Sequence, residues 1–363
     1  MITGGIAAEP ADKPRAPGIS LLVAIAVLAV LVNSTQLREQ LFLGALIAIQ
    51  AYALQFAWRY CGVFSMAYTA MSGVGAYLSV LLALHTNLPL WVGILIAIPG
   101  AIVLGLVVSL VGLRASGMHF VIITYALAGG LEIVADNWTS VTGGTSGLTI
   151  VKPLDLGIVS FGTNEELAAF FVMYALVLLS ILAVVLPRMT RTGKRLVAGR
   201  DNAPLARAVG ISVTSQNIIA LSLSGVICSV AGAVYAFHEY NIQPALFGAT
   251  ASLQVLVVLV LGGLTRWSGP ILGAAFTTLI PQYLGLSPLY TQIAYGVLLI
   301  AVVIFFPEGL AGIASRASAF ARANARKRRR TLRALGEAPP GPPQAVPLAV
   351  TSSDRVTEEA QDG

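Results

Sequence analysis

The run "LWVGILIAIPGAIVLGLVVSLVG", residues 90–112, decides the class of fold. It holds no charged residue, and a helix needs about 20 apolar residues to cross a bilayer core about 30 Å thick. The whole chain has this character, because 56% of its 363 residues are hydrophobic and only 10% are charged. An ordinary soluble domain carries about 25% charged residues, so these few charges could not cover a water-soluble globule. The sequence therefore predicts an all-α integral membrane protein.

Similar runs along the chain predict a polytopic helical bundle of about ten transmembrane segments. The expected spans lie near residues 19–35, 41–58, 62–84, 90–112, 118–135, 167–186, 216–238, 250–264, 269–286 and 289–306. The runs 250–264 and 269–286 flank a glycine-rich turn and could form a re-entrant or broken helix, which a bilayer tolerates only inside protein. Residues 19–32 could instead be the core of a signal peptide, and its cleavage would leave the later topology unchanged.

The basic residues predict how the bundle is oriented. If the N-terminus is cytoplasmic and the number of spans is even, all 22 Lys and Arg residues except Arg38 and Lys152 lie on the cytoplasmic side. Such a bias is what the positive-inside rule requires. We therefore expect a cytoplasmic segment 1–18 and a membrane domain 19–313 with an external loop 136–166 and a cytoplasmic loop 187–215. A basic and then proline-rich tail, 314–363, is expected to be disordered and cytoplasmic, and its basic run could contact lipid headgroups.

The sequence offers little for catalysis or ion coupling. Glu132 is the clear candidate for an ionisable group within a span, so energy for pumping is expected to come from outside this chain. "RTGKR", residues 191–195, is no nucleotide-binding P-loop, because Arg195 follows the lysine where Ser or Thr is required. The three histidines are scattered without the spacing of metal ligands, and Cys61 and Cys228 are read as small buried apolar residues.

One charged stretch, "RLVAGRDNAPLARAVGI" at residues 195–211, interrupts this apolar chain. Asn202 is a suitable N-cap, Pro204 is tolerated in a first turn, and Gly210 suits the position after a helix end. Leu205 and Val209 are four residues apart and share a face of the short helix that we expect here, with Ala206 beside them. On pattern alone the stretch is either a solvated loop that fixes topology or a helix that docks on another protein.

This stretch resembles the cytoplasmic coupling loop of the LivM-type permeases, the membrane subunits of branched-chain amino acid ABC importers. The matching residues are Gly193, Arg200, Asp201, Asn202, Ala206, Gly210 and Ile211. Other segments are similar to further motifs of that family and follow in the family's order: 61–84, 113–148, 222–247, 256–274 and 306–313. The departures at Met66-Ala67, Ala70-Met71 and Gly129-Gly130 fall near the expected substrate path, so they leave the exact substrate open.

The resemblance implies a type II-like importer permease in the bacterial inner membrane, with both termini cytoplasmic. It implies a second, related permease subunit, two cytoplasmic ATPase subunits that hold ATP and Mg, and an external substrate-binding protein. This chain itself would need no cofactor and no metal, would contact membrane lipid, and would bind no nucleic acid. Branched-chain or related amino acids are the expected substrates, and ATP hydrolysis would take place in the partner subunits.

The resemblance also assigns roles to residues. The residues assigned to coupling with the ATPase are Arg200, Asp201, Asn202, Ala206 and Gly210. The substrate path would involve Thr124, Tyr125 and Glu132. The binding protein would dock near Trp138, Thr142, Gly143 and Gly144.

Several alternatives stay open at this point. The chain could serve an importer of urea, amides or another small polar solute, or a simple-sugar importer, although the loop at 136–148 argues against sugars. A stand-alone secondary carrier would use an ion gradient and no ATPase. A membrane-embedded enzyme would need a polar catalytic set, which the sequence does not suggest.

Overall fold

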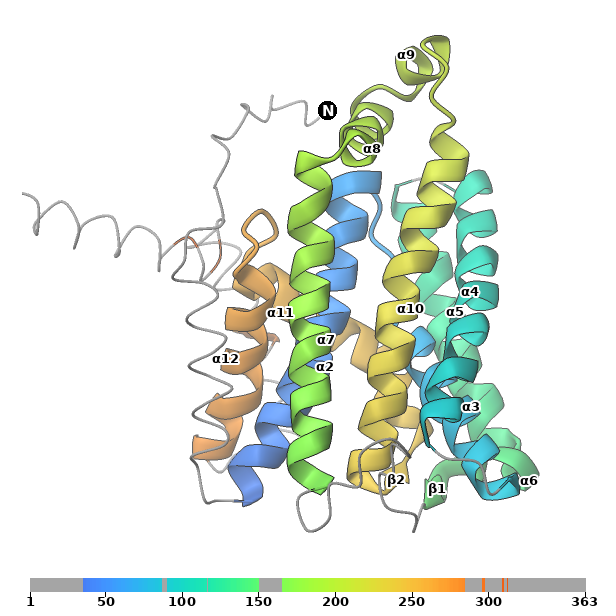
Figure 1. The fold of residues 1–363 in the computed structure, drawn as a ribbon, viewed down its shortest axis with the longest axis vertical. Helices are drawn as coiled ribbons and strands as arrows, with labels where there is room; N and C mark the ends of the chain where they lie inside the picture. Colours follow the sequence, from blue (N-terminus) through green and yellow to red (C-terminus); the bar gives the residue numbers. More distant parts are fainter. Residues whose placement is uncertain are drawn as a thin grey trace, which may run out of the picture. The chain divides into compact units, whose positions relative to one another are not determined.

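A computed structural model describes residues 35–86, 90–115, 117–149 and 165–284, together with 296–297, 309 and 312. These residues belong to the first of two units, Met1–Ala314, and they form a bundle of helices (Figure 1). The expected spans 19–35 and 289–306, the segment 1–18 and the tail 314–363 lie outside the described residues, apart from a few isolated positions.

The described part of the chain contains seven helical stretches that are long and apolar enough to cross a membrane. Among the described residues, the helices of 14 residues or more are α2 (Thr35–Phe56), α3 (Tyr68–His85), α4 (Leu90–Arg114), α5 (Met118–Asn137), α7 (Glu165–Val185), α10 (Val213–Glu239), α11 (Ala249–Gly262) and α12 (Gly269–Leu284). All of them except α12 belong to the seven span-length stretches. The prediction of a helical membrane protein is thus confirmed, whereas the number of about ten spans stays a prediction.

The helices α11 and α12 are the short members of the bundle. Their 14 and 16 residues correspond to about 21 and 24 Å at 1.5 Å per residue, less than a bilayer core of about 30 Å. The 3-10 turn η5 (Pro244–Phe247) precedes α11 and extends it to a stretch of 19 residues.

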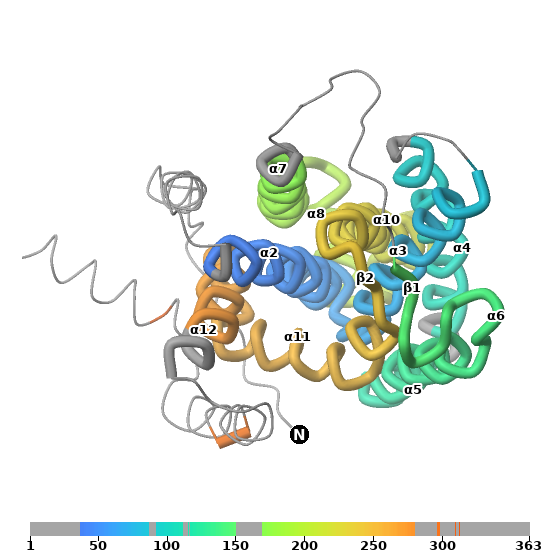
Figure 2. Tube along the Cα trace, turned by 90° about the horizontal axis from the view of Figure 1, so that it is seen from below, coloured from blue at the N-terminus to red at the C-terminus, as the bar shows by residue number. Residues whose placement is uncertain are grey.

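Helix α2 lies at the centre of the described bundle, between α7 and α12 (Figure 2). Two polar side chains in its interior half, Gln50 and Gln55, are buried and bonded to neighbouring elements rather than facing lipid. Gln50 donates to Ser72 Oγ on α3 at 3.0 Å, and Gln55 donates to the carbonyl oxygens of Leu264 and Arg266 at 3.0 and 2.7 Å. These bonds hold α3 and the turn between α11 and α12 against α2, because an unpaired polar group is costly in an apolar interior.

Close helix contacts in the bundle depend on small residues. A Cβ added to Gly75 on α3 would collide with the backbone oxygen of Ser229 on α10, and one on Gly232 would collide with that of Ser72. The same holds between α11 and α12, where Gly273 meets the backbone of Val258. The sequence also carries two pairs of small residues four apart, Ser72 with Ala76 and Gly269 with Gly273, and both lie at or beside such contacts within this chain.

The two ends of the bundle carry different elements (Figure 1). At one end stand η4 (Leu186–Met189), α8 (Arg191–Asp201) and α9 (Ala203–Ala208). At the other end lie α6 (Thr139–Thr142), η2 (Gly144–Ser146) and the strand β1 (Leu148–Thr149), which pairs antiparallel with β2 (Asn241–Ile242). The loops that were expected on opposite sides of the membrane thus lie at opposite ends of the bundle.

Candidate functional site

The charged loop forms two short helices where the sequence suggested one. Thr190 caps the first, α8, by accepting a hydrogen bond from the Gly193 amide at 3.1 Å. Asn202 ends α8 and caps α9, since its Oδ1 accepts from the Leu205 amide at 3.0 Å. Gly210 follows with a φ of +79°, a conformation that favours glycine. The predicted caps of α9 are confirmed, whereas α8 was not anticipated.

The structure shows which face of α9 is buried and which is exposed. Ala206 is buried, with 3% of its surface exposed, so its small side chain packs against this chain and is not offered to a partner. Leu205 and Val209 are 62% and 69% exposed instead. Large apolar side chains so exposed at the tip of a charged loop are typical of a protein-binding surface. Docking through α9 would therefore use Leu205 and Val209.

Arg200 is engaged inside this chain rather than held out for a partner. Its Nη1 donates to the carbonyl oxygen of Arg59 at 2.6 Å, and its Nε and Nη2 donate to Asp201 Oδ1 at 2.9 and 2.7 Å. Arg59 lies in η1 (Ala57–Cys61), the π-helical last turn after α2. The aliphatic part of Arg200 also covers Gly62, where a Cβ would come within 2.7 Å of Arg200 Cγ. This contact, which we name the Arg200 link, joins α8 to the end of α2.

Beyond Gly62 the chain stays non-helical until α3 begins at Tyr68. The sequence predicted a span from residue 62, so the first turns of that expected helix are unwound. Membrane proteins keep unwound backbone within a bundle only where protein or a cavity surrounds it, and such breaks accompany substrate sites in transporters. Met66 and Ala67 in this segment are buried.

Side chains from two helices hold the unwound segment in place, and a third helix supports one of them. The Met66 amide donates to Thr124 Oγ1 on α5 at 3.0 Å, and Ser252 Oγ on α11 donates to the Met66 carbonyl at 2.9 Å. Thr69 on α3 shares a further short hydrogen bond with Ser252. We name Met66, Thr69, Thr124 and Ser252 the inner polar cluster. The structure thus places Thr124 at the unwound segment, while its neighbour Tyr125 is half-buried on the same helix.

Glu132 joins α5 to the start of α11. Its Oε2 accepts the Ala249 amide at 3.0 Å, and a Cβ on the adjacent Gly248 would collide with the carboxylate. A carboxylate at a helix N-terminus is stabilised by the unpaired amides and by the helix dipole. Glu132 also borders a cavity of about 140 Å³, whose lining includes Tyr77, Thr142 and Phe247. The Tyr77 hydroxyl is buried without a hydrogen-bond partner among the described residues.

The residues expected to meet a binding protein lie at the end of the bundle opposite α8 and α9. Trp138 is 56% exposed. Thr142 is buried, and its hydroxyl donates to the Ala135 and Trp138 carbonyls. Gly143 and Gly144 take positive φ values of 72° and 64° in the turn that leads to β1. Trp138 is therefore available at the surface, whereas Thr142, Gly143 and Gly144 shape the loop that carries it.

The sequence assigned no role to Ser252, which sits within the expected span 250–264, or to Arg59, which was expected in a turn between two spans. Met66 was noted only as a departure from the resembling family, and its hydrogen bonds were not anticipated. Gly62 was the one local signal, because glycine favours a φ such as the +72° found here. Within the described residues, no group of three or more His, Cys, Asp or Glu side chains is placed to hold a metal ion.

Residues 36–303 match a protein family described as the permease component of the branched-chain amino acid transport system. The LivM permease proteins of high-affinity branched-chain amino acid transport from Salmonella typhimurium and Escherichia coli are each 25% identical over 270 residues. In both, the alignment covers 69% of this chain and 64% of the relative, so the chain spans slightly less than two thirds of their length. The ribose import permease RbsC of Escherichia coli is 27% identical over 265 residues, which cover 65% of this chain and 80% of RbsC. No solved structure matches the chain.

Proposed function

The chain belongs to the family of branched-chain amino acid transport permeases, and on that premise we propose that it is the translocating subunit of an ATP-driven importer. It acts in the bacterial inner membrane beside a second, related permease subunit, as a type II-like bundle of about ten spans. Two ATPase subunits, which hold ATP and Mg, bind at the cytoplasmic side, and a substrate-binding protein docks outside. Both termini are cytoplasmic in this arrangement.

The observation that carries the proposal is the Arg200 link. A coupling element must touch the ATPase on one side and the translocation path on the other. The exposed Leu205 and Val209 of α9 offer the first contact. The bond from Arg200 to the Arg59 carbonyl supplies the second, at 2.6 Å, directly before the unwound segment that follows Gly62. Asp201 orients Arg200, Asn202 caps α9, and Gly210 ends it.

A movement of α8 would then displace the inner polar cluster through the unwound segment that connects them. Arg200 holds the end of α2, and the unwound segment runs from there to Met66, which is bonded to both Thr124 and Ser252. Three helices, α3, α5 and α11, therefore meet at backbone that has no regular secondary structure. Hydrogen bonds between side chains and unwound backbone can exchange partners more readily than helical ones, so this is where we expect the path to open.

The opposite end is proposed to receive the substrate. Trp138 offers an exposed aromatic contact for a binding protein. The nearby cavity brings together the Glu132 carboxylate and the unpaired Tyr77 hydroxyl. A carboxylate suits an ammonium group, and the apolar wall formed by Leu131, Val134 and Phe247 suits an aliphatic side chain. Branched-chain or related amino acids fit this combination.

An importer of a small polar solute is the second candidate, because the alignment covers 80% of a ribose import permease.

The test is uptake by the reconstituted complex in liposomes. Leucine or valine uptake that requires ATP and the binding protein is expected, with ribose and urea as competing substrates. If the complex takes up ribose or urea but no amino acid, the proposed substrate class is wrong and a small polar solute takes its place. Uptake without ATP that an ionophore abolishes would indicate a stand-alone carrier and overturn the proposal.

A further inference from the structure

Four successive backbone carbonyls at residues 264–267, the turn between α11 and α12, accept hydrogen bonds from side chains of α2 and of its last turn η1. The bonds run from Tyr52 to Trp267 at 2.7 Å, from Gln55 to Leu264 and Arg266 at 3.0 and 2.7 Å, and from Arg59 to Thr265 at 2.9 Å. The donors are three and four positions apart, so they follow one face of the helix. We name residues 264–267 the hairpin turn.

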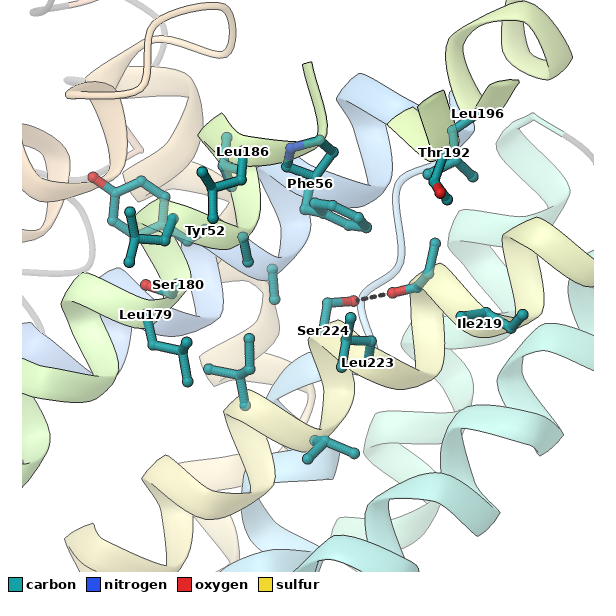
Figure 3. A pocket seen from close by; sticks show the side chains of 18 of the residues that line it. Tyr52, Phe56, Leu179, Ser180, Leu186, Thr192, Leu196, Ile219, Leu223 and Ser224 are labelled. Carbon is teal, nitrogen blue, oxygen red and sulfur yellow. Dashed lines mark hydrogen bonds between the residues drawn. The ribbon is translucent and has the colours of Figure 1, made fainter. Parts of the chain in front are cut away.

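The three donors differ in their surroundings. Tyr52 and Gln55 are completely buried, and Figure 3 shows the Tyr52 hydroxyl turned away from Ser224 on α10. Their bonds fasten the hairpin turn to α2 inside the protein. Arg59 is half-buried at the edge, and Thr265 is exposed. Since a partly exposed polar contact adds little stability, holding the fold together does not account for Arg59.

Arg59 contacts two moving parts of the proposed machinery at once. Its carbonyl oxygen accepts the bond from Arg200 Nη1, 2.6 Å long, that forms the Arg200 link. Its own Nη1 donates to the Thr265 carbonyl. A displacement of α8 that moves Arg59 therefore pulls on the hairpin turn as well as on the unwound segment after Gly62.

Beyond the hairpin turn, α11 and α12 form a closely packed pair. A Cβ added to Gly262 of α11 would collide with the backbone oxygen of Gly269 on α12. Backbones in such contact leave no room for the helices to slide, so a pull on the turn moves α11 as a rod. Toward its other end, α11 carries Ser252, whose Oγ donates to the Met66 carbonyl at 2.9 Å.

Two routes that start at Arg59 thus meet at one hydrogen bond. The first runs along the backbone from Arg59 to Met66. The second runs from the Arg59 guanidinium through Thr265 and α11 to Ser252. When both routes act, Met66 and Ser252 move together and their bond is kept. Without the guanidinium, Met66 moves while α11 stays behind.

We propose that Arg59 is a positioning residue for transport, whose guanidinium makes the α11–α12 pair follow α8. This role rests on the proposed function, since it requires an ATPase that moves α8. It adds to the Arg200 link a second connection, from the cytoplasmic loop to the helix that holds the inner polar cluster.

The test measures leucine uptake per ATP hydrolysed by the reconstituted complex. Arg59→Met should lower this ratio about three-fold, because a partly exposed bond from a charged donor is lost. Arg59→Lys keeps a charged donor and should lower it less than about two-fold. Arg266→Gln is the matched control: it removes a cation from the same turn, but its backbone oxygen still accepts from Gln55, and the ratio should not change.

A double variant separates positioning from a general loss of stability. Arg200→Ala, for which a roughly ten-fold loss is expected, breaks the path before it reaches Arg59. Adding Arg59→Met should therefore leave the loss at about ten-fold, whereas independent effects would multiply to about thirty-fold. Arg59→Met alone should melt within roughly 2 °C of the unaltered complex.

The outcomes distinguish this role from the proposed function. No ATP-driven uptake by the unaltered complex would overturn both. Normal uptake by that complex, with equal ratios for Arg59→Met and Arg266→Gln, would overturn the role of Arg59 alone. A thirty-fold loss in the double variant would do the same, and so would an Arg59→Met chain that no longer assembles, because Arg59 would then support the fold.

Discussion

Replacement of Arg200 by alanine is expected to uncouple ATP hydrolysis from transport while the complex stays assembled. The change removes the bond from Nη1 to the Arg59 carbonyl, 2.6 Å long, and the cover over Gly62. It leaves Leu205 and Val209 of α9 in place, so the docking surface is kept. This variant should therefore lose ATP-driven uptake while it still binds the ATPase.

The magnitude follows from the kind of bond that is lost. A hydrogen bond from a charged donor contributes about 1.5–3 kcal/mol when it is sheltered. The Arg200 side chain is 32% exposed, so the lower end of that range, about 1.5 kcal/mol, applies. That value corresponds to a roughly ten-fold loss of ATP-driven uptake, since 1.4 kcal/mol is a factor of ten. Arg200→Lys keeps the charge but loses the planar fork, and about a three-fold loss is expected.

Asp201→Asn is the matched control. This change weakens only the ion pair between Asp201 and Arg200. The Asp201 side chain is 58% exposed, and a surface pair of this kind contributes about 0–1 kcal/mol. Less than a two-fold change in uptake is expected. Gly62→Ala provides an independent route to the same defect, because φ is +72° there and its Cβ would displace Arg200. The assay is uptake and ATPase activity of the same proteoliposomes, and normal uptake in Arg200→Ala would refute the reasoning.

Three further predictions concern the ends and the interior of the bundle. Leu205→Asp with Val209→Asp should abolish co-purification of an ATPase without lowering the amount of folded chain, and an intact complex would contradict docking through α9. Glu132→Ala removes the cap of α11 and should cost about 1 kcal/mol, seen as a melting temperature lower by roughly 2 °C, whereas an unchanged melting temperature would count against the cap. Gly75→Ala would place a Cβ on the Ser229 carbonyl and should destabilise the bundle by about 1–3 kcal/mol in the same melting assay, while Gly130→Ala, with open space around it, should not.

Much of the bundle could be predicted because apolar runs of span length leave few alternatives. The expected spans at 90–112, 118–135 and 216–238 agree with α4, α5 and α10 within a few residues. The caps of α9 were also predictable, since Asn202 and Gly210 act through local backbone geometry.

The interior of the candidate site could not be predicted in the same way. Residues 62–67 have the composition of a span, and what keeps them unwound is a set of bonds to Thr124 and Ser252, far away in the sequence. The burial of Ala206 could not be predicted for a similar reason. Helix periodicity gives the faces of α9, but only the packing of α8 and α10 beneath it decides which face is buried.

The proposed function depends above all on α9 as the surface through which an ATPase drives this permease. A photo-crosslinking amino acid placed at Val209, whose side chain is 69% exposed, tests it in native membranes. Mass spectrometry then identifies the protein attached to it. We expect an ATPase subunit with a P-loop as the main product, and the same probe at Trp138 should not yield it. A product with an external binding protein at Val209, or an ATPase attached at Trp138 instead, would contradict the claim.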